Sequence, residues 1–225
     1  MLAAALALVP AAARAATPGV EHGTMMISAE RLFGLDVSHS SQDIAGGTIE
    51  RDQTHFGLAL APLAPNPNPY LLPRLAFDFA IIDGLAVGGS LGFGLGEADV
   101  GNSKPSYSTF LIAPRIGYVL GLTKPISLWL RGGLTYFNLT SHADPSVLPP
   151  NTDRSVTLWG LSLNLEPTLM ISPIEHVAFT AGVLIDLPLA GKQSTETRAG
   201  SVTTTTSADF TFRNFGLVGG LVVLF

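Results

Sequence analysis

The sequence predicts an all-β fold, a closed antiparallel up-and-down β-barrel that spans a membrane, preceded by an N-terminal signal peptide. Three observations favour it. Apolar side chains alternate with small or polar ones through most of the chain, the two-residue period of a strand with two unlike faces. Short turns alternate with long polar connections, which is typical of membrane barrels. The chain also ends on an apolar strand, at Phe225.

The last strand, 214–225, shows the alternation most clearly. One face carries Phe215, Leu217, Leu221, Val223 and Phe225, with Gly219 as a weak member, and the other face carries mostly small residues. A chain end frays in water unless it is held in place. We therefore expect this strand to pair with the first strand, with its apolar face turned outward into lipid.

Composition restricts both the compartment and the function. The 225 residues are 47% hydrophobic and 13% charged, about half the charge share of a typical soluble domain, ~25%. The net charge of −5 comes without a basic stripe, so no nucleic-acid partner is expected. The absence of cysteine excludes disulfides, thiolate metal sites and a cysteine nucleophile.

The first 15 residues resemble a secretory signal. An apolar run from Leu2 to Val9 precedes Ala13-Arg14-Ala15, an A-x-A-like cleavage site. No lysine or arginine precedes the run, and a start codon assigned too far downstream would explain that. The run is far shorter than the roughly 20 residues of a membrane helix. We expect cleavage after Ala15 and a single barrel domain over 16–225.

Eight strands are expected in the barrel. They cover 25–40, 73–82, 85–96, 108–119, 127–137, 158–171, 176–187 and 214–225. The tight turn Asp83-Gly84 joins the second to the third. Residues 41–72 are interpreted as a long first outer excursion that contains a short strand. Counting that strand as spanning would give nine, whereas bacterial single-chain barrels have even numbers, so ten strands are the alternative.

Three residues conflict with this simple pattern. Pro114 and Pro167 fall inside expected strands, where proline breaks the hydrogen-bond ladder, so we expect a bulge or a bend at each. Arg31 falls on the apolar face. We expect it to extend along the barrel wall to the membrane interface.

On these residues the chain resembles the small bacterial outer-membrane β-barrels of the OmpA transmembrane type. The resemblance rests on the signal segment, the amphipathic strands, the alternation of short turns and long loops, and the terminal phenylalanine. It implies the cell outer membrane as location and outer-membrane lipid as surroundings. It also implies that Phe215, Leu217, Leu221, Val223 and Phe225 form the signal read by the barrel-insertion machinery.

Five inward charged residues lie at similar heights on their strands. They are about four or five residues from the nearest short turn, within one layer at ~3.3 Å per residue, and comprise Glu30, Asp78, Arg115, Arg131 and Glu166. We expect three carboxylates and two guanidiniums to form a charge layer across the lumen. An eight-stranded barrel is narrow enough for side chains to fill, so a plug is preferred to an ion gate.

The other candidate site residues give weaker evidence of a function. Five scattered histidines show no metal-ligand spacing, and no metal or cofactor is expected. Ser162, His176 and Glu166 are the one catalytic trio considered, as in a lipid-modifying enzyme. The preferred function is a structural or surface-interaction barrel with a plugged or narrow lumen and no catalysis. A small-solute or ion pore is the alternative. No ligand of the long outer loops can be named.

Overall fold

The computed structural model describes residues 20–44, 47–58, 68–97 and 103–225. The expected signal peptide, residues 1–15, lies outside the described residues. The strands are β1 (Met25–Ile44), β2 (Gly47–Leu58), β3 (Arg74–Ile82), β4 (Leu85–Glu97), β5 (Ser106–Thr123), β6 (Ile126–His142), β7 (Thr152–Ile174), β8 (Val177–Ala199) and β9 (Val202–Leu224). Two short 3-10 helices, η3 (Pro69–Leu71) and η4 (Pro145–Val147), lie in the connections.

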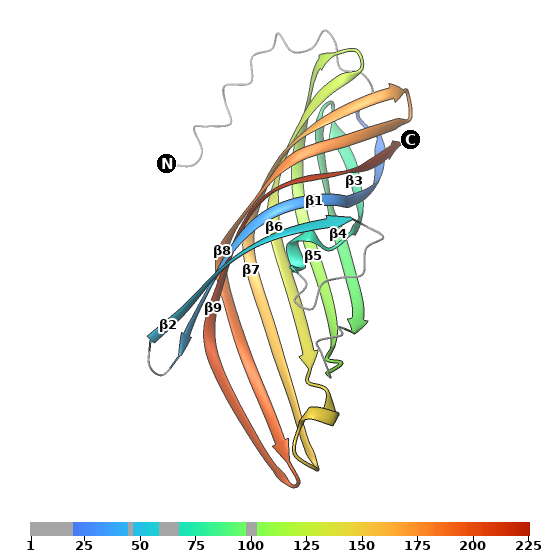
Figure 1. The fold of residues 1–225 in the computed structure, drawn as a ribbon. Helices are drawn as coiled ribbons and strands as arrows, with labels where there is room; N and C mark the ends of the chain where they lie inside the picture. Colours follow the sequence, from blue (N-terminus) through green and yellow to red (C-terminus); the bar gives the residue numbers. More distant parts are fainter. Residues whose placement is uncertain (1–19, 45–46, 59–67, 98–102) are drawn as a thin grey trace.

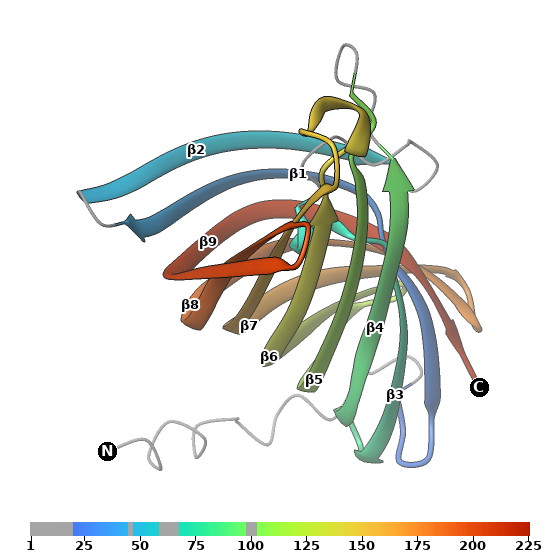
Figure 2. The same cartoon turned by 90° about the horizontal axis from the view of Figure 1, so that it is seen from below.

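The strands form one closed antiparallel sheet (Figures 1 and 2). Each of β3 to β8 pairs with the strand that follows it, and β1 pairs with both β3 and β9. These eight strands close the ring, which confirms the expected barrel and the pairing of the last strand with the first. The ninth strand, β2, is added to the outer half of β1, where Gly47–Leu58 run opposite Phe33–Ile44.

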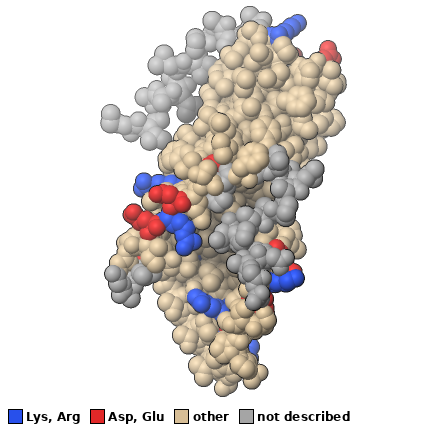
Figure 3. Space-filling model, viewed as in Figure 1, with Lys and Arg blue, Asp and Glu red and all other residues tan. Residues whose placement is uncertain are grey.

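The exterior face is the one that the alternation predicts. On β9, Phe215, Leu217, Leu221 and Phe225 are 50%, 58%, 37% and 64% exposed, while Val218 and Val222 are buried inside. From Phe215 to Phe225 the strand rises about 33 Å, or about 25 Å along the barrel axis at a tilt of ~40°, the height of a membrane barrel's apolar band. Figure 3 shows the matching broad surface almost without charge.

The two ends of the barrel differ as expected. At one end β3–β4, β5–β6 and β7–β8 are joined by two-residue turns, among them Asp83-Gly84, where Gly84 has a φ of 78° that favours glycine. This is the short-turn end, and both described chain ends lie there (Figure 1). The opposite, long-loop end carries the η4 connection and the tips of β8 and β9.

Three details of the wall differ from expectation. The polar stretch from Gly191 to Asp209 is a continuous β8–β9 hairpin with a two-residue turn at Gly200-Ser201, where a long loop was expected. Residues 41–44 extend β1 and 47–58 form the whole of β2, so less of 41–72 is an excursion than predicted. The last residues of the expected excursion, 68–72, pack inside the barrel.

The two prolines produce no bulge. Pro114 stands opposite Gly89 in an unbroken β4–β5 register, and the β5–β6 register is the same on both sides of it. Pro167 stands opposite Leu130, with an unshifted register to β8 on either side. Each proline interrupts pairing along only one edge of its strand, so the expected bulges are wrong. Within the four described ranges, no helix has the length and hydropathy needed to cross a membrane.

Candidate functional site: the filled interior

The inside of the barrel contains a charged cluster between two apolar ones. Strand β6 crosses all three, because Trp129 belongs to the apolar cluster at the short-turn end, Arg131 to the charges, and Phe137 to the second apolar cluster. Trp129 is 0%, Phe137 1% and Arg131 6% exposed. Inward side chains therefore fill the barrel along its axis.

The five charged residues predicted for the lumen lie together. Arg115 bonds Asp78 through two nitrogens, at 2.9 and 2.5 Å, and Glu30 at 2.8 Å. Arg131 bonds both Glu30 and Glu166. The side chains are 5% exposed or less. Buried ions lose their hydration, and charge-assisted bonds of this kind are what can compensate for that loss.

A sixth member, Arg31, was expected outside. Its side chain is 1% exposed and its guanidinium lies 3.5 Å from Glu166. Glu30, Arg31 and Leu32 stand opposite Gly220 alone, in an irregularity between Ala29 and Phe33. Arg31 has a φ of 58° there, so two consecutive side chains turn inward. The expected extension of Arg31 along the outer wall is therefore wrong.

Arg31 balances the layer electrically. The residues called the charge layer below are Glu30, Arg31, Asp78, Arg115, Arg131 and Glu166. Three carboxylates now face three guanidiniums, where the predicted five would have left one negative charge in excess. Trp129 adds a contact from the short-turn side, since the Arg131 and Arg115 guanidiniums lie 4.5 and 5.5 Å from its ring centre.

A segment of the chain itself closes the other side. This plug segment, residues 68–72, is held to the wall by Asn68, whose amide nitrogen bonds Asp36 of β1 and Asn214 of β9. The same side chain accepts from the Tyr70 N–H at 2.9 Å. The Tyr70 ring is 5.3 Å from both Phe137 and Phe212. Tyr70 and Leu72 are each 1% exposed, so the plug segment is part of the core.

Sequence reasoning missed the residues around this plug segment. Arg74 donates to the Tyr70 carbonyl at 3.4 Å, and Asn164 donates to Asp186 at 2.9 Å. Arg74, Asn164 and Asp186 are all buried. Their inward parity was visible in the sequence. Nothing in the sequence indicated that a proline-rich connection re-enters the barrel to meet them.

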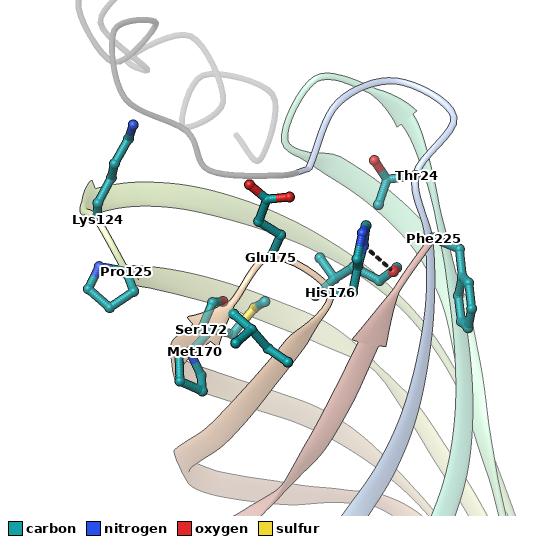
Figure 4. Close-up of a pocket in the computed structure, with 11 residues that line it drawn as sticks. Thr24, Lys124, Pro125, Met170, Ser172, Glu175, His176 and Phe225 are labelled. Carbon is teal, nitrogen blue, oxygen red and sulfur yellow. Dashed lines mark hydrogen bonds between the residues drawn. The ribbon is translucent and has the colours of Figure 1, made fainter.

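The catalytic trio is not assembled. Ser162 is buried in the wall, 3.5 Å from the Thr135 carbonyl, and Glu166 is engaged in the charge layer. His176 lies at a turn of the short-turn end, where its Nδ1 is 3.2 Å from the Leu224 carbonyl (Figure 4). Within the described ranges, no group of three or more histidine, aspartate or glutamate side chains is placed to hold a metal ion.

A cavity of about 620 Å³ opens at the short-turn end. Lys124, Glu175 and His176 stand along its rim in Figure 4. Its lining includes Met170 and Leu224, which belong to the buried apolar cluster below. The cavity therefore ends on the packed interior.

Comparison with known proteins identifies the fold. No protein-family model matches the chain, and no curated protein matches it. Among solved structures, the outer membrane protein OprG of Pseudomonas aeruginosa matches with a TM-score of 0.57 at 13% identity, over 92% of this chain and 98% of OprG. AlkL in lipid bilayers matches with a TM-score of 0.49 at 12% identity, over 93% of each chain.

A major outer membrane protein of Thermus thermophilus gives a TM-score of 0.46 at 12% identity, over 91% of this chain and 100% of that one. The last two scores are too low to carry an argument. The OprG match agrees with the closed sheet and its apolar exterior. The chain has the fold of a small bacterial outer-membrane β-barrel, in agreement with the resemblance found in the sequence and with the expected location.

Proposed function

We propose that this protein is an integral outer-membrane barrel whose filled lumen does not conduct, and which serves a structural and surface-interaction role. The observation that carries the proposal is the packing of the interior. The apolar cluster at the short-turn end, the charge layer, and the second apolar cluster with the plug segment follow one another along the barrel axis. The largest of their side chains are almost fully buried. Water and ions then have no wide path through the barrel.

Reconstitution tests this proposal. Purified protein in planar bilayers is expected to give no stable conductance steps, and vesicles that contain it are expected not to swell in small sugars. Arg131→Ala serves as the comparison, because it removes a central cation of the charge layer. Large stable channels in the unmodified protein, with an ion selectivity altered by Arg131→Ala, would show a pore instead.

The proposed role includes no catalysis. Its support is the separation of Ser162, Glu166 and His176 into three different environments. A mass shift in the membrane lipids on overproduction, lost in His176→Ala, would contradict it.

The proposed surroundings are outer-membrane lipid, with the barrel-insertion machinery as a transient partner through the last strand. The exterior positions of Phe215, Leu217, Leu221, Val223 and Phe225 support this part of the proposal. These side chains face away from the packed interior, so the insertion machinery can bind them before the barrel enters the lipid.

The strand pairing of the barrel wall favours a second candidate function. Among the described residues, β2 pairs only with β1, and Phe93–Glu97 of β4 pair only with β5. Among the described strands, the ring that β1, β3 and β9 close toward the short-turn end is therefore open toward the long-loop end, beside the plug segment. This favours sideways passage of small apolar molecules between the aromatic interior and the membrane. Faster uptake of an uncharged aromatic dye by vesicles that contain the protein than by empty vesicles would support it.

A further inference from the structure

The long-loop end carries a sheet that rises above the closed ring. Strand β7 pairs with β8 as far as Thr152 and Ala199, and β8 pairs with β9 as far as Ala199 and Val202. On the other side of β9, the last partner from β1 is Gln42, opposite Phe210. Among the described residues, Val202–Asp209 therefore have a strand neighbour on one side only (Figure 1). We call this side the β9 edge.

The β9 edge lies in water, beyond the apolar band. The exterior face of β9 changes from Phe215 to the exposed Arg213, which marks the end of the band. Residues 202–209 begin four positions further on, so they extend from about 13 to about 36 Å along the strand at ~3.3 Å per residue. Residues 202–207 are all exposed.

Free strand edges are usually protected by charge, proline or a bulge, because their unpaired N–H and C=O groups bind other strands. The free edges of β2 and of the end of β7 follow that rule. Glu50, Arg51 and Asp52 lie on β2, and Asp153 and Arg154 lie on β7 beyond its last β6 partner. Over 202–207 the β9 edge reads VTTTTS, with neither charge nor proline, and its one charged residue, Asp209, lies at the end nearest the closed ring. The register of the edge with β8 is unbroken.

We propose that the β9 edge is a docking site for an extended peptide segment of another protein, which adds to the sheet as a fourth strand. Backbone hydrogen bonds supply the affinity in this mode, and alternate side chains supply the specificity. The edge offers threonine methyl and hydroxyl groups on both faces, so the segment it fits is uncharged, β-branched or hydroxylated, and about eight residues long.

A second copy in the same membrane fits this edge less well. Copies in one membrane are related by an axis along the membrane normal, and Figure 1 shows the part of β9 toward the β8–β9 tip running largely along the barrel axis. Such an axis would place two β9 edges parallel to each other. Parallel pairs are slightly less stable per residue than antiparallel ones, whereas a free peptide can approach in the antiparallel direction.

The test uses the intact protein in lipid nanodiscs and a labelled octapeptide of alternating threonine and valine. Saturable binding is expected. The double variant Thr203→Lys/Thr205→Lys, which adds charge to the edge, should bind at least tenfold more weakly. The matched control, Thr195→Lys/Thr197→Lys on β8, adds the same charge to a strand that is paired on both sides, and should bind within twofold of the unmodified protein.

Hydrogen exchange provides a measurement that needs no variant, since bound peptide should slow amide exchange within 202–209. The proposal is overturned by an absence of saturable binding, by equal losses in the two double variants, or by equal binding of the same peptide with prolines at alternate positions. Self-cross-linking of Thr205→Cys with no peptide binding would assign the edge to a second copy. The inference rests on the proposed surface role, but a non-conducting barrel that binds no peptide would overturn the docking site alone.

Discussion

Replacing Arg131 by methionine should destabilise the barrel by about 4 kcal/mol, because removing one partner of a buried ion pair costs about 3–5 kcal/mol. The Arg131 guanidinium bonds Glu30 and Glu166, lies 3.3 Å from the Thr168 hydroxyl and stacks over Trp129. Methionine is apolar and unbranched, so it fills the space without supplying charge.

Two features set the size of the expected effect. Glu30 retains Arg115 at 2.8 Å, and Glu166 retains Arg31 at 3.5 Å, so neither carboxylate is left alone. This keeps the whole ionic loss near the lower end of the range, at about 3 kcal/mol. The lost contact with the Trp129 ring adds about 1 kcal/mol.

The assay is urea unfolding in lipid vesicles, with heat-modifiable gel migration as the measure of folded barrel. Arg213→Met is the matched control, because Arg213 is exposed on the exterior and such a change costs within about 0.5 kcal/mol. Arg131→Met combined with Glu166→Gln should lose less than the two single changes added together, since removing both partners leaves less charge unpaired. If Arg131→Met were no more costly than Arg213→Met, the buried ionic layer would not hold the lumen together.

Four further predictions concern single positions. Arg31→Gly should be about 1 kcal/mol more stable than Arg31→Ala in the same urea assay, because residue 31 has a φ of 58°; equal stabilities would contradict the strained bulge. Gly133→Ala should cost about 1–3 kcal/mol, since its Cβ would collide with the Pro114 backbone oxygen. The adjacent Gly132→Ala should cost less, because its Cβ meets the flexible Leu165 side chain at 3.3 Å and the Asn164 oxygen at an ordinary 3.6 Å. Phe225→Ser should lower the amount of assembled barrel in cells while refolding in vitro is nearly unchanged, because residue 225 is 64% exposed; a similar loss in both assays would argue against an insertion signal. The Ser146 N–H, and after it the Lys104 N–H, donate to Asp144 and lower the pKa of its carboxyl, so these bonds should persist above that lowered pKa and be lost as pH falls through it. NMR shifts of both amides should therefore titrate with a midpoint below the ordinary value of ~3.9, and a midpoint at or above that value would contradict this assignment.

The barrel was predictable from sequence because its two sides are in contact with different media. Apolar exterior positions such as Leu217 and Phe215 have to alternate with small or polar interior ones wherever a strand crosses lipid. The same alternation orders inward charges by height, which brought Arg131 and Glu166 into one expected layer; the register places them directly opposite each other.

The bulge in β1 escaped prediction for a definite reason. The bulge sets three β1 residues against one β9 residue. Because the two extra residues are an even number, the alternation is unchanged beyond the bulge, and odd-numbered side chains face outward again from Phe33. The only sign was a cation, Arg31, on an apolar face. The plug segment was harder to predict. Tyr70 follows a proline-rich stretch in which the alternation of apolar and polar residues is lost, and the partners of Tyr70 lie far away in the sequence.

The β1–β9 seam has a consequence for how the barrel assembles. Arg131 and Glu166 sit on neighbouring strands and can meet as soon as that hairpin forms. Glu30 instead reaches Arg115 and Arg131 only when the first strand is laid against the strands that follow it around the ring, and its seam with β9 joins the two ends of the chain. Until then two arginines lack part of their neutralising charge, so a chain closed in the wrong register would keep a charge imbalance at its centre. Electroneutrality thus favours the correct closure over its shifted alternatives.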